Sequence, residues 1–175
     1  MRDRREFWSE DLRYGLALGR STLDDVFRMC REVGDLETGG ILVGHYNRQH
    51  DCALVTRASA PPVDSSRGHA WFKRGLHGLK SWLHSLWSQG NYYLGEWHYH
   101  PGAAPTPSVR DRSQMFSIAR SPSYQCPEPV GLIVGGIPDD WLVGAFVFTD
   151  DGMVELRRVP PVPSDHSPMA TRNSD

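Results

Sequence analysis

Residues 97–111 hold the side chains whose types and spacing could do chemistry. His98 and His100 are two apart in a segment with strand character, so both imidazoles leave the same face. After a loop rich in Gly and Pro, Ser108 stands where a helix N-cap belongs, and Asp111 falls one turn inside that helix. Two histidines and an aspartate can therefore converge as three protein ligands, and a catalytic zinc site keeps its fourth position for water.

Each half of this pattern also has an ordinary structural explanation. A His-x-His pair on a strand is often incidental, and Ser-x-x-Asp is a common helix start. The two halves occur together, and the loop between them can return the chain to the end of the strand, so the combination favours a metal site. Zinc in such a site lowers the pKa of its water to about 7 and polarises a carbonyl. Hydrolysis would also need a general base and a donor for the oxyanion.

The order His98-x-His100, seven residues, Ser108, two residues and Asp111 resembles the HxHx7SxxD signature of the JAMM (MPN+) zinc metalloproteases. That family also has an upstream glutamate at the start of a strand, and Glu37 in the segment ETGGILVG matches it. By this resemblance, the two histidines and Asp111 bind Zn²⁺. Glu37 takes the proton of the attacking water and returns it to the leaving amine. Ser108 donates a hydrogen bond to the oxyanion.

The neighbouring residues add to the family pattern or depart from it. Tyr99 stands where the family commonly has Ser or Thr, and we expect a change in packing because its side chain points away from the metal face. Glu96 shares the metal face, where it either orients an imidazole or is an ordinary paired or solvated carboxylate. Trp71 and Phe72 either contact a substrate from a loop beside the site or anchor the following helix.

The alternation of apolar patterns predicts an α/β sheet flanked by helices. The resemblance implies a single MPN (JAMM) domain, with a mixed β-sheet flanked by helices in a cytidine-deaminase-like arrangement. Helices are expected to begin at Ser21 or Thr22, near Leu76 and near Ser108, the first with Asp24 and Asp25 in its first turn and Gly34 at its end. Strands are expected at residues 16–18, 38–46, 52–58, 92–100, 130–134, 141–148 and 154–159.

Composition divides the 175 residues into three parts. Residues 1–13 are a charged lead-in, from which Phe7 and Trp8 could dock on the body. Residues 14–158 form the metalloprotease domain, and residues 159–175, rich in Pro and Ser, are expected to be a disordered tail.

Charge and cysteine content exclude several other functions. The formal net charge of −2 does not suggest a nucleic-acid partner. Neither a signal peptide nor an apolar run of roughly 20 residues is evident, so we expect a cytoplasmic protein without a membrane span. Cys30, Cys52 and Cys126 are too widely spaced for a disulfide framework or a thiolate zinc site. A zinc deaminase would need HxE and PCxxC, which the sequence around Cys126 lacks.

The resemblance implies an isopeptidase or peptidase that hydrolyses the amide bond after the C-terminal Gly of a ubiquitin-like protein. The compact layout is similar to the prokaryotic JAB branch, whose bacterial members serve anti-phage operons of the CBASS or Bil type. The implied partners are a ubiquitin-like protein and its conjugates, with the ubiquitin-activating and ubiquitin-conjugating enzyme homologues of the same operon. Two alternatives stay open: a processing peptidase for a sulfur-carrier-type ubiquitin-like precursor, and a non-catalytic MPN scaffold.

Overall fold

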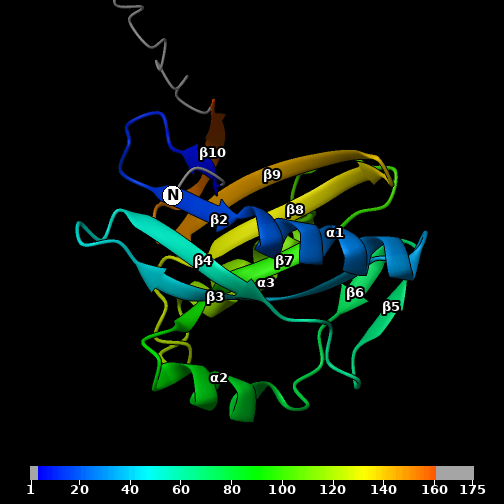
Figure 1. Ribbon diagram of the computed structural model, residues 1–175, viewed down its shortest axis with the longest axis horizontal. Helices are drawn as coiled ribbons and strands as arrows, with labels where there is room; N and C mark the ends of the chain where they lie inside the picture. Colours follow the sequence, from blue (N-terminus) through cyan, green and yellow to red (C-terminus); the bar gives the residue numbers. More distant parts are fainter. Residues whose placement is uncertain (1–3, 161–175) are drawn as a thin grey trace, which may run out of the picture.

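The computed structural model describes residues 4–160 (Figure 1), in which eight strands close into a barrel in the order β1-β10-β9-β8-β7-β3-β4-β2. Its strands are β1 (Arg4–Trp8), β2 (Gly15–Gly19), β3 (Thr38–Tyr46), β4 (Cys52–Ala58), β7 (Tyr92–Tyr99), β8 (Val130–Ile137), β9 (Asp140–Thr149) and β10 (Gly152–Val159). A separate two-stranded sheet holds β5 (Ser66–Gly68) and β6 (Trp71–Lys73). The helices are α1 (Arg20–Val33), α2 (Leu79–Trp87) and α3 (Val109–Ala119).

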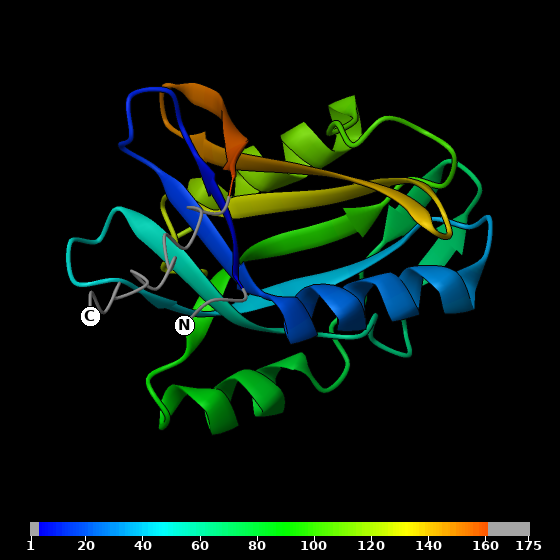
Figure 2. The same ribbon diagram turned by 45° about the horizontal axis from the view of Figure 1, so that its top comes forward.

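The large sheet is mixed, as expected. Strand β7 pairs antiparallel with β3 and parallel with β8, while β2 pairs parallel with β4. Helix α1 lies against β2 and β4 and shares the main hydrophobic core with the barrel strands, α2 lies against β7, and α3 lies against β9 (Figure 2). No helix within residues 4–160 is long and apolar enough to cross a membrane.

Closure of the barrel depends on residues that we expected to precede the domain. Strand β1 lies inside the expected lead-in of residues 1–13, and it pairs with both β2 and β10. Phe7 is 2% exposed and belongs to the main hydrophobic core, so the folded body begins before residue 14. At the other end β10 continues to Val159, the first residue of the expected tail, and residues 161–175 lie outside the described part of the chain.

Strand β7 separates the core from the candidate site by its alternation of side chains. Trp97 and Tyr99 belong to the main core cluster, and Tyr99 makes an edge-to-face contact with Trp141 at 5.6 Å. The expectation that Tyr99 points away from the metal face is therefore confirmed. His98 pairs with Ile133 of β8, which packs under α3, so the opposite face of β7 looks toward that helix.

Helix α1 begins at Arg20, one or two residues before the expected start at Ser21 or Thr22. Its N-cap is Gly19, which supplies no side-chain hydrogen bond, and the first turn contains no acidic residue. The hydroxyl of Thr22 donates instead to the backbone oxygen of Thr56, because β4 runs beside the helix. The expected placement of Asp24 and Asp25 in the first turn was therefore wrong. Gly34 does end the helix, with a φ of 70° that favours glycine.

The segment between β4 and α2 is more ordered than its loop-like composition suggested. Strands β5 and β6 pair as a short hairpin, in which Arg67 lies opposite Phe72. Helix α2 begins only at Leu79, and Leu76, which we expected on its apolar stripe, is 68% exposed.

Candidate metal centre

The chain returns to the end of β7 along a path that backbone hydrogen bonds hold in place. The amide of His100 donates to Val134 at 2.8 Å, which extends the pairing with β8 by one residue. Gly102 donates to Gly136, and Gly136 donates back to Ala103, so the loop after the strand is pinned to β8. These bonds anchor the first residues of the loop beside β8.

Ser108 and Asp111 form the capping box that begins α3. The Asp111 amide donates to Ser108 Oγ at 3.1 Å, and the Ser108 amide donates to Asp111 Oδ2 at 2.7 Å. These reciprocal bonds satisfy two backbone donors at the helix start. They also fix the direction of the Asp111 carboxylate, which points back past the start of the helix toward the histidines at the end of β7.

The carboxylate meets both imidazoles in a buried cluster. His98 Nδ1 lies 3.0 Å from Asp111 Oδ1, and His100 Nε2 lies 3.3 Å from Asp111 Oδ2. One potential ligand atom from each of the three residues lies within 4.8 Å of the others. The residues are between 6% and 8% exposed, so water screens them poorly.

These donors fit zinc. Among residues 4–160, His100 Nε2 is the one buried side-chain nitrogen or oxygen without a hydrogen-bond partner, as expected of an atom that needs a metal. Two imidazole nitrogens and one carboxylate oxygen are the ligand types of catalytic zinc, and they leave a fourth position open. The structure thus brings together the three residues predicted as ligands.

The pKa values of His98 and Asp111 are set mainly by the charged groups around them and by their burial. Burial alone would lower the pKa of His98, but the nearby carboxylates of Asp111 and Glu96 outweigh burial and raise that pKa to about 9. Burial would raise the pKa of Asp111, but the two imidazoles that face its carboxylate and the hydrogen bond from the Ser108 amide hold that pKa far below its usual value. Both shifts follow from the close contact of imidazoles and carboxylates in a buried site.

Glu37 stands beside the cluster at the start of β3. The register pairs Thr38 with Tyr99, so one further step along both strands sets Glu37 opposite His100. The Glu37 amide donates to Gly68 of β5 at 2.9 Å, which holds the position. The Glu37 side chain is half-buried, and this burial raises the pKa of its carboxyl group. The two histidines oppose the rise, whereas the negative charge of Asp111 adds to it.

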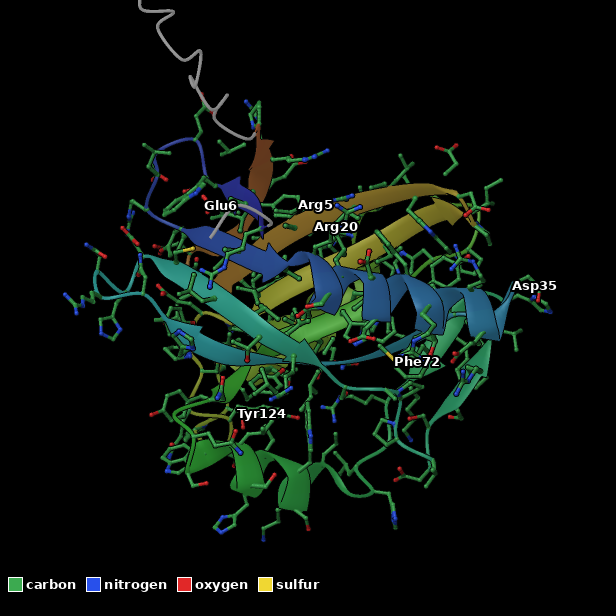
Figure 3. All side chains as sticks on the ribbon, in the orientation of Figure 1. Arg5, Glu6, Arg20, Asp35, Phe72 and Tyr124 are labelled. Carbon is green, nitrogen blue, oxygen red and sulfur yellow. The ribbon has the colours of Figure 1, made fainter. Side chains whose placement is uncertain are left out.

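The two other acidic residues near Glu37 are directed elsewhere. Asp35 is exposed and lies 3.5 Å from His69, and Figure 3 shows it projecting from the end of the molecule. Glu32 pairs with Arg28 on the surface of α1. Of these three acidic residues, Glu37 is therefore the one that interacts electrostatically with the His98–His100–Asp111 cluster.

Phe72 lies beside one of the proposed metal ligands. It is 3% exposed and makes an edge-to-face contact with the His98 ring, with 5.7 Å between ring centroids. It belongs to the wall of the site rather than to the apolar cluster beneath α2. Trp71 is 41% exposed, so its indole remains accessible at the surface.

Glu96 is buried and paired, and it lies beside one of the proposed metal ligands. Its carboxylate accepts hydrogen bonds from Arg74 and Gln114 and lies 3.6 Å from His98 Nε2. Sequence reasoning missed both partners. Gln114 lies three residues after Asp111 on α3, and that spacing on one helical face could have revealed it. Arg74 follows a three-residue strand and carries no periodic signal.

Comparison with known proteins agrees with this geometry. A family model described as prokaryotic homologues of the JAB domain matches residues 19–147, which is most of the chain. The chain belongs to this family. It is a JAMM-type hydrolase, and the His98–His100–Asp111 cluster lies within the matched residues.

Relatives of this JAB-domain protein carry enzymatic names. The protein named CD-NTase/cGAS isopeptidase of Enterobacter hormaechei subsp. hoffmannii is 44% identical over 132 residues, which cover 75% of this chain and 73% of that protein. The probable metalloprotease y4qB of Sinorhizobium fredii is 30% identical over 117 residues, covering 65% and 71% respectively. Among solved structures, protein DSY2949 of Desulfitobacterium hafniense has the same fold, with a TM-score of 0.60, 20% identity and coverage of 79% and 87%.

Proposed function

We propose that this JAB-domain hydrolase is a zinc-dependent isopeptidase, which cuts the amide bond after the C-terminal Gly of a ubiquitin-like protein and so releases it from its conjugates. We further propose that it serves a bacterial anti-phage operon of the CD-NTase type, in the cytoplasm. The observation that carries the proposal is the buried His98–His100–Asp111 cluster with Glu37 beside it, in a chain related to proteins named CD-NTase/cGAS isopeptidase.

In this proposal each site residue has one role. His98, His100 and Asp111 hold the metal, and zinc bound there would acidify a water molecule and polarise the scissile carbonyl. Glu37 takes a proton from the attacking water and gives it to the leaving nitrogen as the C–N bond breaks. Burial raises the pKa of Glu37, which makes its carboxylate a stronger base toward the proton of the attacking water.

Ser108 would stabilise the negative charge that develops on the carbonyl oxygen. Its Oγ already accepts the Asp111 amide, and a hydroxyl that accepts one hydrogen bond can still donate its own proton. The cap fixes the oxygen beside the metal ligand, so the donor is positioned before substrate arrives.

The hairpin of β5 and β6 would receive the substrate tail. This sheet has only two strands, so the outer edge of β6 pairs with no further strand of residues 4–160 and an extended peptide can add there. Phe72 of β6 contacts the His98 ring, so this edge lies beside the proposed metal ligands. A Gly-ending tail has no side chain to keep its last carbonyl away from the cluster.

The deciding experiment uses a ubiquitin-like protein from the same operon, joined through its C-terminal Gly either to a lysine side chain or to the N-terminus of a soluble protein. Mass spectrometry should locate the cut directly after Gly in the lysine-linked substrate, and metal analysis should find about one zinc per chain. A His98→Ala/His100→Ala variant should contain no zinc and cut nothing. Cleavage elsewhere in the fusion partner, or equal cleavage of a tail that ends in Val, would contradict the substrate assignment.

The relatives named isopeptidases favour deconjugation over processing of a sulfur-carrier-type precursor. The same two substrates separate these functions, because a processing peptidase would prefer the linear fusion. The complete ligand set speaks against a non-catalytic scaffold, since a scaffold has no need of buried metal ligands.

A further inference from the structure

A buried charged cluster adjoins His98 on the side away from Asp111. Glu96 is 2% exposed, and its Oε1 accepts two hydrogen bonds from Arg74, at 3.0 Å from Nε and 2.8 Å from Nη2. Its Oε2 accepts from Gln114 Nε2 at 2.7 Å. The Tyr93 hydroxyl adds a longer hydrogen bond to Oε1 at 3.4 Å.

The partners come from three separate parts of the fold. Arg74 follows the β5–β6 hairpin and is itself buried, with 7% of its side chain exposed. It also donates to Gly75 and Tyr124, and the latter lies between the sheet and α2 in Figure 3. Gln114 comes from α3, one turn after Asp111. The cluster thereby joins the hairpin, β7 and α3 immediately behind one metal ligand.

Glu96 reaches the metal ligand through a single oxygen. His98 Nε2 lies 3.6 Å from Oε2, which is the distance of an ion pair and longer than a hydrogen bond. The other ring nitrogen, Nδ1, faces Asp111 at 3.0 Å. The ring therefore stands between two carboxylates, one in the metal cluster and one behind it.

The space around the ring admits little movement. Phe72 lies against it edge-to-face, and a Cβ at Gly39 would lie only 3.2 Å from His98 Cδ2 and 3.1 Å from Phe72. Packing thus fixes the plane of the imidazole. It does not decide which of the two nitrogens carries the proton, because that depends on charge and hydrogen bonding.

We propose that Glu96, held by Arg74 and Gln114, is a positioning residue that keeps the proton of His98 on Nε2 and leaves Nδ1 free to bind the metal. This inference rests on the proposed function, because it assigns a role toward the same zinc. A carboxylate behind a ligating histidine orients the ring and raises its basicity, and loss of such a partner lowers metal affinity about 10- to 100-fold.

Stability alone gives a poor reason for this arrangement. The free energy needed to remove a carboxylate and a guanidinium from water can exceed the free energy gained from their attraction. Replacing a buried ion pair with apolar residues is therefore often neutral or stabilising. The pair lies directly behind His98, so a role toward this proposed metal ligand explains its position better than stability does.

The experiment compares zinc affinities, measured by competition with a chromophoric chelator, for the wild type, Glu96→Gln and the double variant Arg74→Met/Glu96→Gln. The double variant removes both charges, so neither remains buried without a partner. We expect both variants to bind zinc about 10- to 100-fold more weakly than the wild type. The double variant should regain the melting temperature that the single variant loses. Arg28→Met/Glu32→Gln, which removes an exposed pair on α1, is the matched control and should bind zinc as the wild type does.

A double variant with wild-type zinc affinity would overturn the inference and leave Glu96 as a charge partner of Arg74 alone. A second measurement needs no variant: ¹⁵N NMR of the zinc-loaded wild type should show the His98 proton on Nε2. A proton on Nδ1 would also overturn the inference. A wild type that binds no zinc at all would instead refute the proposed function, so the two failures are distinguishable.

Discussion

Replacing Ser108 with Ala separates two roles that one hydroxyl group combines. The substitution removes the acceptor of the Asp111 amide, a 3.1 Å hydrogen bond, and with it the proposed donor to the oxyanion. It leaves the reciprocal bond intact, because the Ser108 backbone amide that donates to Asp111 Oδ2 at 2.7 Å is also present in Ala. The direction of the Asp111 carboxylate, and with it the affinity for zinc, should therefore change little.

The two losses have different magnitudes in different measurements. Loss of a helix N-cap costs about 1 kcal/mol, which for a domain of this size lowers the melting temperature by about 2–4 °C. Loss of one oxyanion donor lowers the rate of the chemical step about 10²–10³-fold, or roughly 3–4 kcal/mol of transition-state stabilisation. The catalytic effect should thus exceed the effect on stability severalfold in free energy.

The assay is single-turnover cleavage of the Gly-linked conjugate by zinc-saturated enzyme, beside thermal unfolding of the same samples. Ser108→Thr, which keeps a hydroxyl at the N-cap, should restore most of both properties. A Ser108→Ala enzyme that melts a few degrees lower but cleaves within about threefold of the wild-type rate would show that Ser108 only caps the helix. The oxyanion role would then have to be withdrawn.

Three further predictions follow from the same geometry. Glu37→Gln should keep zinc content and melting temperature near those of the wild type and abolish turnover, so cleavage at a wild-type rate would require another base. Phenanthroline should stop cleavage and iodoacetamide should not, because burial raises the pKa of Cys52 to about 11 and of the other two thiols to about 12; inactivation by iodoacetamide without unfolding would contradict this. Phe7→Ala should destabilise the fold by about 3–5 kcal/mol, because the side chain is buried in the main core, and a melting temperature equal to that of the wild type would contradict that contribution.

The ligand set could be predicted from sequence because each part of it obeys a local rule. Alternation along a strand puts His98 and His100 on one face, and the capping box puts Asp111 one turn after Ser108. Both rules operate within a few residues and need no knowledge of the rest of the chain. The structure follows both of them.

The parts that were missed depend on partners far away in sequence. Strand β1 has few apolar residues, and its pairing with β2 and β10 decides that it is a strand. Thr22 looked like a helix start, but its hydroxyl bonds to Thr56, 34 residues away. Arg74 meets Glu96 across 22 residues, so neither spacing nor composition could reveal the pair.

The spacing within the Ser-x-x-Asp half of the signature has a physical cause in this structure. Ser108 is the N-cap and Asp111 is the third helical residue, and only at that separation can the two side chains and two amides exchange hydrogen bonds. Asp111 Oδ2, which takes the Ser108 amide, also lies 3.3 Å from His100 Nε2, so the bond that begins the helix also aims the ligand. Moving either residue by one position would lose the helix cap and the metal ligand together.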